Sequence, residues 1–112
     1  MNRYAAVVEV KPDSVDEYCQ LHKETWQEVL NILDNANMHN YSIYLREINK
    51  SGIFLFSYFE YTGNDFEKDM ALVAANPITQ KWWAVCKPCL KPLHGITIEQ
   101  CWAPMTEVFH KN

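Results

Sequence analysis

The stretch IFLFSYFEY at residues 53–61 is the feature that most restricts how this 112-residue chain can fold. Aromatic and β-branched residues favour strands, and here they stand on both faces, with only Ser57 and Glu60 as polar exceptions. Successive strand residues point to opposite sides, so this strand has to be covered from two directions. The rest of the chain must supply those covers, or a partner must.

A strand and a long helix are predicted before it. RYAAVVEV at 3–10 is typical of a strand, which Pro12 ends. Ser14 and Glu17 fit a capping box, with Asp13 as a competing cap. After these, apolar and aromatic residues recur at helical spacing and predict one long helix: Val15, Tyr18, His22, Trp26, Val29 and Leu33.

A hairpin is predicted in the middle of the chain. HNYSIYL at 39–45 alternates, and NKSG at 49–52 has the composition of a turn that leads into the strand at 53–61. The alternation places one set of residues on a common face: Tyr41, Ile43 and Leu45.

The last third of the chain is predicted to be helical and then extended. Asn64 or Asp65 can cap a helix that Asn76-Pro77 ends, and ITQKWWAV predicts another helix. CKPCLKPLHGIT indicates a loop, and MTEVFH at 105–110 is expected to be a short closing strand.

This order of elements predicts the α+β, ferredoxin-like βαββαβ fold, formed by residues 1–112 as one domain. Helices would cover one face of its sheet and leave the other face apolar. A chain of this length cannot cover that second face alone. We therefore expect a homodimer in which two sheets meet face to face.

Charge and length exclude several classes of protein. The net charge is −4 and no run of Lys or Arg occurs, whereas nucleic-acid binding needs a basic surface. The N-terminal residues do not form a signal peptide, and the most apolar segment is too short to cross a membrane. We expect a soluble cytoplasmic protein with neither nucleic acid nor membrane as a partner.

The metal-ligating residue types form no clear site. Cys86 and Cys89 have the spacing of a redox or zinc pair, but they follow a predicted helix and lead into a loop. We interpret them as thiols in or near the core. The four histidines are scattered, and the three glycines form no phosphate-binding loop. The sequence thus predicts no metal and no cofactor.

Aromatic residues with polar edges are the remaining candidates for chemistry. Tyr18 and His22 lie four positions apart, one turn of the predicted helix, and Trp82 and Trp83 are adjacent. A Tyr–His pair at this spacing more often packs in a core than catalyses a reaction. Adjacent helical residues point about 100° apart, which favours a pocket wall for the tryptophans. Spacing alone leaves packing and a sugar pocket both open.

Four patches of sequence, EYCQLHKETW, HNYSIYL, TQKWW and the closing EVFH, resemble the L-rhamnose mutarotase family in order and approximate spacing. The resemblance implies a ferredoxin-like subunit that pairs into a dimeric α+β barrel. It also implies that His22 is the proton donor, that Tyr18 and Tyr41 bind substrate, and that Trp82 and Trp83 are the family's tandem tryptophan. The residues between 84 and 106 carry no part of it.

The function that this resemblance implies is interconversion of the α and β anomers of a 6-deoxyhexose, with L-rhamnose as the first expected substrate. Histidine can give and take protons near neutral pH, and ring opening and closing needs no cofactor. One alternative is a mutarotase for L-fucose or another deoxyhexose. Another class is a dimeric α+β barrel that only binds a ligand or acts as a small monooxygenase, because the fold alone does not select function.

Overall fold

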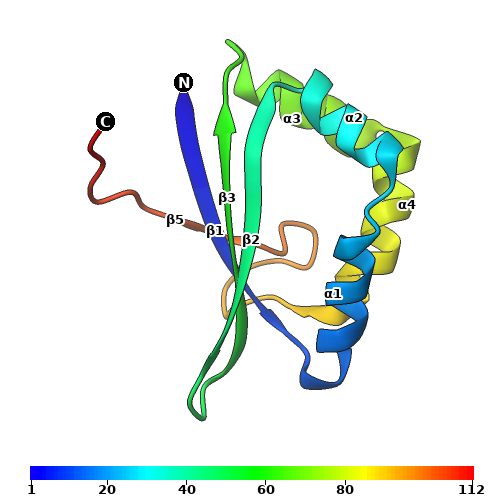
Figure 1. Cartoon of the computed structure of the whole chain (residues 1–112), viewed down its shortest axis with the longest axis vertical. Coiled ribbons are helices and arrows are strands. Elements are labelled where there is room, and N and C mark those ends of the chain that lie inside the picture. The colour runs from blue at the N-terminus through cyan, green and yellow to red at the C-terminus, as the bar shows by residue number, and fades with distance from the viewer.

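A curved sheet and an arc of helices face each other across the molecule (Figure 1). The computed structural model describes all residues from 1 to 112. Its elements, in chain order, are β1 Asn2–Val10, a 3-10 turn Pro12–Ser14, α1 Val15–Lys23, α2 Gln27–Asn35, β2 Met38–Ile48, β3 Gly52–Tyr61, α3 Phe66–Ala75, α4 Pro77–Cys86, a second 3-10 turn Lys87–Cys89, β4 Leu90–Lys91 and β5 Ala103–Met105.

The sheet has the strand order β2-β3-β1-β4, and β5 also pairs with β1. All neighbours are antiparallel, so the predicted ferredoxin-like α+β fold is confirmed. The fourth strand position is shared by two short strands that both pair with β1. Residues 92–102 run between them as a loop, and the predicted loop at 86–97 covers its first half. The sequence did not indicate the two short strands on either side of it.

The single long helix predicted from Val15 onward is wrong, because α1 ends at Lys23 and α2 begins at Gln27. Trp26 is extended, with φ −60° and ψ 134°, and the Thr25 hydroxyl donates to the His22 carbonyl at 3.1 Å. The His22 carbonyl lies near the C-terminal end of α1, where no following helical turn supplies a backbone N–H. The Thr25 hydroxyl takes the place of that donor. The break lets the helical layer bend around the sheet.

Helix caps agree with the prediction at one end and not at another. The Asp65 side chain accepts a hydrogen bond from the Lys68 backbone N–H at 3.2 Å, as expected for the N-cap of α3. The capping box of Ser14 and Glu17 does not form. A 3-10 turn precedes α1 instead, and the Ser14 backbone N–H donates to the Lys11 carbonyl.

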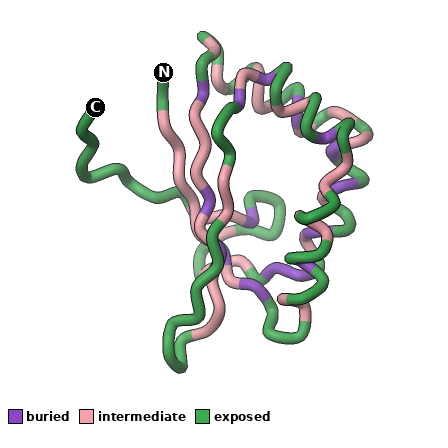
Figure 2. The backbone as a smooth tube through the Cα atoms, viewed as in Figure 1, coloured by how far each residue is buried: buried purple, intermediate pink, exposed green.

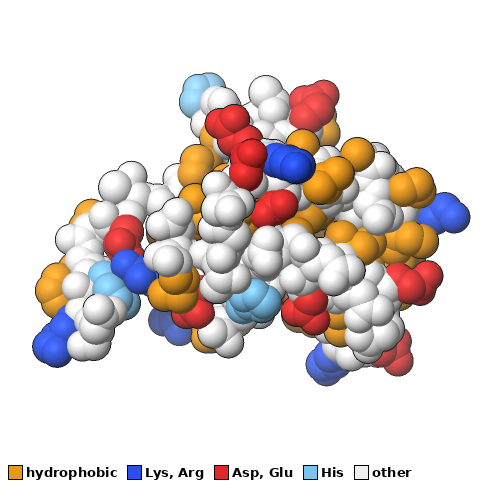
Figure 3. Space-filling model, turned by 90° about the horizontal axis from the view of Figure 1, so that it is seen from above, with side chains coloured by type: hydrophobic (Ala, Val, Ile, Leu, Met, Phe, Trp, Pro, Cys, Tyr) orange, Lys and Arg blue, Asp and Glu red, His pale blue; other side chains and the backbone are white.

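The closing strand predicted at 105–110 is also wrong. β5 ends at Met105, and the residues beyond it form no strand. An edge strand is held from one side only, and Pro104 has no N–H to donate to the ladder. Seen from above, the C-terminal end of the chain projects as a lobe to the left of the main body (Figure 3).

The sheet has an inner face toward the helices and an outer face away from them. Val8 and Val10 are fully buried on the inner face, where Val8 pairs with Leu55. Only 16 of the 112 residues are buried, and they gather between sheet and helices (Figure 2). All the helices lie on the inner side, and none covers the outer face (Figure 1).

No helix is long and apolar enough to span a membrane. No group of three or more His, Cys, Asp or Glu side chains is arranged to hold a metal ion.

Candidate functional site

Two adjoining cavities lie between the inner face of the sheet and the helices. Their volumes are about 690 Å³ and about 190 Å³, and the same residues line both: His22, Tyr41, Ile43, Trp82 and Trp83. Ligand sites in proteins typically have a few hundred Å³, mostly apolar walls and a few polar groups. A smaller hollow between α2 and α3 contains no histidine or aromatic side chain, so the two adjoining cavities are the better candidate site.

Helix α1 brings Tyr18 and His22 to this site. Their rings stack with centroids 4.1 Å apart, as expected for side chains one helical turn apart. Tyr18 is buried and lines the smaller cavity, whereas His22 is half-buried and lines both cavities. The helical spacing therefore serves packing and a pocket at once.

The imidazole of His22 is held in one tautomer. Its Nδ1 lies 3.0 Å from the Tyr18 carbonyl oxygen, which can only accept a hydrogen bond, so Nδ1 carries the proton. Burial lowers the pKa of His22 below 6.5, against a smaller opposite effect of that hydrogen bond. At neutral pH the ring is uncharged, and Nε2 is a free acceptor on a side chain that lines both cavities.

A β-bulge turns Tyr41 toward the helices. His39 pairs with Glu60 and Ser42 with Tyr58, so β2 contains one extra residue between these pairs, where Asn40 has a φ of 50°. Without the bulge, strand alternation would place positions 38 and 41 on opposite faces. With the bulge, both residues line the larger cavity: Met38, which is buried, and Tyr41, which is partly exposed.

The tandem tryptophan of α4 forms the wall opposite the sheet. Trp82 is buried and meets the His22 ring edge-on at 5.3 Å and the Trp26 ring at 5.1 Å. Trp83 is half-buried beside it and lines both cavities. Both adjacent tryptophans therefore line the cavities, and their contact with a substrate stays a prediction.

The two tyrosine hydroxyls stay protonated at ordinary pH. Burial is the main cause that raises the pKa of Tyr18, and neighbouring Tyr41 raises it further. Burial also raises the pKa of Tyr41, whose side chain lines both cavities. Both side chains can donate a hydrogen bond to a ligand but are poor sources of a free proton.

The sequence did not indicate the rear wall of the smaller cavity. Glu99, Gln100, Cys101 and Trp102 line it from the loop between β4 and β5. Lys87 ties this loop to α4, because its Nζ lies 4.8 Å from the centre of the Trp83 ring and donates to the Glu99 carbonyl at 3.1 Å. No motif marks these residues, so only the folded structure places them.

The cysteines near the site are free and buried, which agrees with their interpretation as core thiols. Cys86, Cys89 and Cys101 are each no more than 5% exposed. Burial raises the pKa of Cys86 to about 12 and raises the pKa values of the other two thiols. Thiols of this kind are weak nucleophiles at neutral pH.

Solved structures with the same architecture support the assignment of fold. An L-rhamnose mutarotase from Formosa agariphila superimposes with a TM-score of 0.76 at 21% identity, and tetracenomycin F2 cyclase from Streptomyces glaucescens with 0.64 at 13%. Both comparisons cover 100% of each chain. The chain therefore has the ferredoxin-like α+β fold of the dimeric α+β barrel class of proteins.

Sequence comparison narrows this class. The family model described as L-rhamnose mutarotase matches residues 3–111. The L-rhamnose mutarotase of Oceanobacillus iheyensis is 36% identical over 98% of this chain and 98% of its own length. That of Shouchella clausii is 35% identical over 81% and 82%, respectively. The chain belongs to the L-rhamnose mutarotase family.

Proposed function

We propose that this protein interconverts the α and β anomers of L-rhamnose, and that His22 moves the proton. The observation that carries this proposal is the His22 imidazole, fixed at Nδ1 and uncharged, on the wall shared by both cavities. The family to which the chain belongs supports the choice of sugar.

The reaction needs one proton to leave the anomeric hydroxyl and one to reach the ring oxygen. Neutral His22 accepts the hydroxyl proton at Nε2 while the C1–ring oxygen bond breaks and C1 becomes an aldehyde. The imidazolium then gives the proton to the former ring oxygen. One imidazole can serve both oxygens because both are bonded to C1 in the closed sugar. After rotation about the C1–C2 bond, the reverse steps close the ring to the other anomer.

The other predicted site residues bind and orient the sugar. Tyr18 and Tyr41 donate hydrogen bonds to its hydroxyl groups, since their raised pKa values keep the phenols protonated. Trp82 and Trp83 pack against the apolar C–H face and the methyl group of the 6-deoxy sugar. Because the walls of the cavities are mostly apolar, few polar groups are available, and each hydrogen bond to the sugar strongly affects how the sugar is oriented.

The working unit is a homodimer formed through the outer face of the sheet. Phe54, Phe56 and Tyr58 alternate with the inner residues of β3 and lie on this outer face, as the register with β1 requires. They are half-buried by neighbouring strands, but no helix covers them (Figures 1 and 2). Pairing with a second copy removes this apolar surface from water.

Exchange between the two anomers of L-rhamnose, measured by saturation-transfer NMR without added metal or cofactor, tests the proposal. We expect exchange well above the spontaneous rate with L-rhamnose, and less with L-fucose and D-glucose. Exchange that stays at the spontaneous rate with L-rhamnose would contradict the proposed activity. Equal acceleration of L-fucose would contradict the proposed preference.

A further inference from the structure

The larger of the two cavities exceeds what the proposed reaction needs. The five residues proposed to act on the sugar all line the smaller cavity of about 190 Å³: Tyr18, His22, Tyr41, Trp82 and Trp83. That cavity has room for one deoxyhexose ring. The larger cavity, about 690 Å³, has the size of pockets that bind drug-sized molecules. A single sugar leaves most of it unused.

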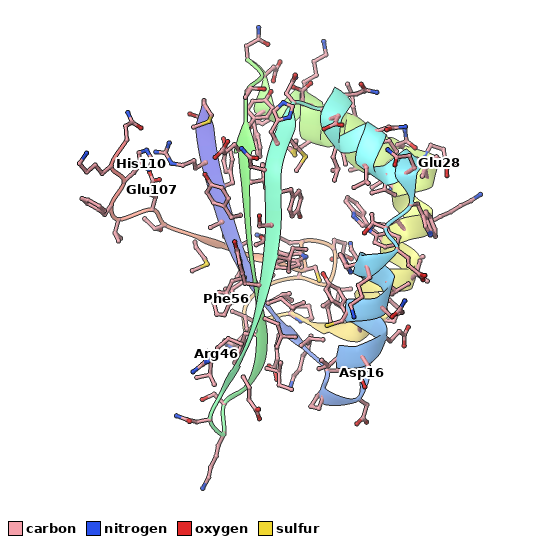
Figure 4. All side chains as sticks on the ribbon, in the orientation of Figure 1. Asp16, Glu28, Arg46, Phe56, Glu107 and His110 are labelled. Atoms are coloured by element: carbon pink, nitrogen blue, oxygen red, sulfur yellow. The ribbon has the colours of Figure 1, made fainter.

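The wall of the larger cavity is apolar over α2, β2 and α3. Helix α2 turns one side towards the cavity, and Glu28 lies on the opposite side of that helix (Figure 4). This part of the wall consists of Val29, Leu30, Leu33, Met38, Met70 and Val73. The two methionines favour an aromatic ligand, because contacts between a thioether sulfur and an aromatic ring are stabilising. An aromatic group would therefore gain by leaving water for this cavity.

One buried hydroxyl interrupts the apolar wall. Thr79 of α4 is only 3% exposed and lines the larger cavity, and its Oγ1 has no hydrogen-bond partner in the protein. The other threonine of this cavity, Thr25, already donates to the His22 carbonyl. A buried hydroxyl without a partner is unfavourable, because it has given up its hydrogen bonds to water. A ligand that brings an oxygen to Thr79 restores what was lost.

Helical spacing places Thr79 beside the sugar site. Trp82 and Trp83 follow it by three and four residues, so the three side chains share one side of α4. Trp82 in turn meets the His22 ring at 5.3 Å. The free hydroxyl of Thr79 therefore lies one helical turn from the tryptophans that line both cavities, within reach of a ligand that occupies both.

The position of His22 sets the direction of such a ligand. His22 lines both cavities, so a sugar whose C1 oxygen meets Nε2 has that carbon at their border. A group joined to the C1 oxygen then extends into the larger cavity. In a glycoside this group is the aglycone. Because a glycoside has no proton on that oxygen, ring opening cannot begin, and the glycoside binds without reacting.

We propose that the larger cavity binds the aglycone of a phenolic glycoside, with the sugar in the smaller cavity and a phenol hydroxyl hydrogen-bonded to Thr79. This inference rests on the proposed function, because the position of the sugar follows from proton transfer at His22. The protein then binds its sugar in a glycosylated as well as a free form, and phenolic glycosides compete with the free sugar.

Calorimetric titration with two glycosides tests the occupant. We expect 4-hydroxyphenyl α-L-rhamnoside to bind at least 10-fold more tightly than methyl α-L-rhamnoside, whose methyl group leaves the larger cavity empty. Failure of the 4-hydroxyphenyl glycoside to bind more tightly would overturn the aglycone site, even if exchange of L-rhamnose is accelerated. Exchange at the spontaneous rate would instead overturn the proposed function.

The contact with Thr79 is tested by Thr79→Val, which removes the hydroxyl and keeps the branched shape. We expect it to weaken the 4-hydroxyphenyl glycoside about 2- to 10-fold and to leave unsubstituted phenyl α-L-rhamnoside unchanged. Equal effects on the two aromatic glycosides would overturn this contact.

The location of the aglycone is tested by filling the larger cavity. Ala74 of α3 lines it, so Ala74→Phe should abolish the preference for the 4-hydroxyphenyl over the methyl glycoside. The same change at Ala71, which is exposed on α3 and does not line this cavity, is the control and should keep the preference. A folded Ala74→Phe protein with the full preference would overturn the location.

Discussion

The two faces of the sheet differ in what covers them, although they are made from the same strands. The inner face packs under four helices and encloses cavities lined by His22, Tyr41 and the tandem tryptophan. The outer face carries Val7, Phe56 and other apolar residues in rows, and no element of its own chain lies over it. The inner face has polar groups in an apolar setting. The outer face is apolar at its centre and charged towards one end, where Phe54 lies between Glu9 and Arg46.

The alternation of residues along a strand predicts which side chains share a face of the sheet. It does not predict what each face does. Leu55 and Phe56 are adjacent on β3, one buried in the core and the other half-buried on the outer side. Nothing in their residue types separates them. We propose chemistry for the inner face because His22 and Tyr41 line an enclosed cavity there, and association for the outer face because its apolar centre is left uncovered.

The largest effect is expected on the inner face. His22→Ala removes the group that we propose moves the proton, so the anomer exchange rate should fall by roughly 10²–10⁴. The fold should persist, because the ring is only half-buried beside Tyr18 and Trp82. NMR exchange and thermal unfolding are measured on one sample. A folded variant that equilibrates the anomers at the wild-type rate would contradict the assignment of proton transfer to His22 on the inner face.

A substitution on the outer face is expected to change dimerisation before it changes activity. Phe56 lies on the outer face between Val7 of β1 and Tyr44 of β2. We expect this central position to be a hot spot of the proposed interface, so the charge in Phe56→Glu should cost about 2 kcal/mol, roughly 30-fold in the dimer dissociation constant. Analytical ultracentrifugation over a concentration series measures this constant. Ser42→Glu, at the border of the same face, is the control and should change it much less. Equal effects of the two changes would argue against an apolar centre.

The pH dependence should follow the inner face. The proposed reaction begins from neutral His22, whose pKa is lowered by burial, so kcat/KM should be constant above pH 6.5 and fall about tenfold per unit below the lowered pKa. The folded state also binds this proton more weakly than the unfolded state. This contribution to stability is therefore complete above the unfolded pKa and is lost as the pH falls through the folded pKa. A rate that rises on acidification would contradict the order of proton steps.

A smaller change is expected for one hydroxyl. Tyr18→Phe keeps the ring that stacks on His22 and removes one hydrogen bond, which is worth about 0.5–1.5 kcal/mol, or roughly 2- to 10-fold. The change should appear mainly in KM. A loss as large as that of His22→Ala would instead assign the proton transfer to Tyr18.

The smallest effect is expected from the buried thiols at the smaller cavity. The raised pKa of Cys86, about 12, and its burial should protect it from iodoacetamide, whereas exposed Cys19 should react. Mass spectrometry should show one adduct and the exchange rate should not change. Modification of Cys86 in the folded protein, with loss of activity, would make the cysteines part of the site.

Much of this arrangement follows from local pattern. The strands near 3–10 and 53–61 and the cap at Asp65 depend on alternation and short-range hydrogen bonds, and the sequence predicted them correctly. The break after Lys23 was missed, because it depends on how the helices bend around a cavity. The end of β5 at Met105 was missed because nothing on the same chain covers Val108 and Phe109.

The candidate site divides in the same way. Tyr18 and His22 share a helical turn, and Trp82 and Trp83 are neighbours, so both pairs could be found from spacing. The loop that contains Glu99 could not, because it meets Trp83 only through Lys87 and the packing of distant elements. Local spacing in the sequence predicts which side chains lie next to each other. The packing of distant elements decides which residues lie across the cavity from them.

The loop of residues 92–102 starts and ends on the same strand, because β4 and β5 both pair with β1. Its two ends are therefore fixed whatever its length, and doubling a flexible loop costs only about 0.6 kcal/mol in closure entropy. The rear wall of the smaller cavity is thus an exchangeable part. Evolution, or an engineer, can rebuild this wall to change the ligand that the pocket accepts, while His22 and the sheet keep their places.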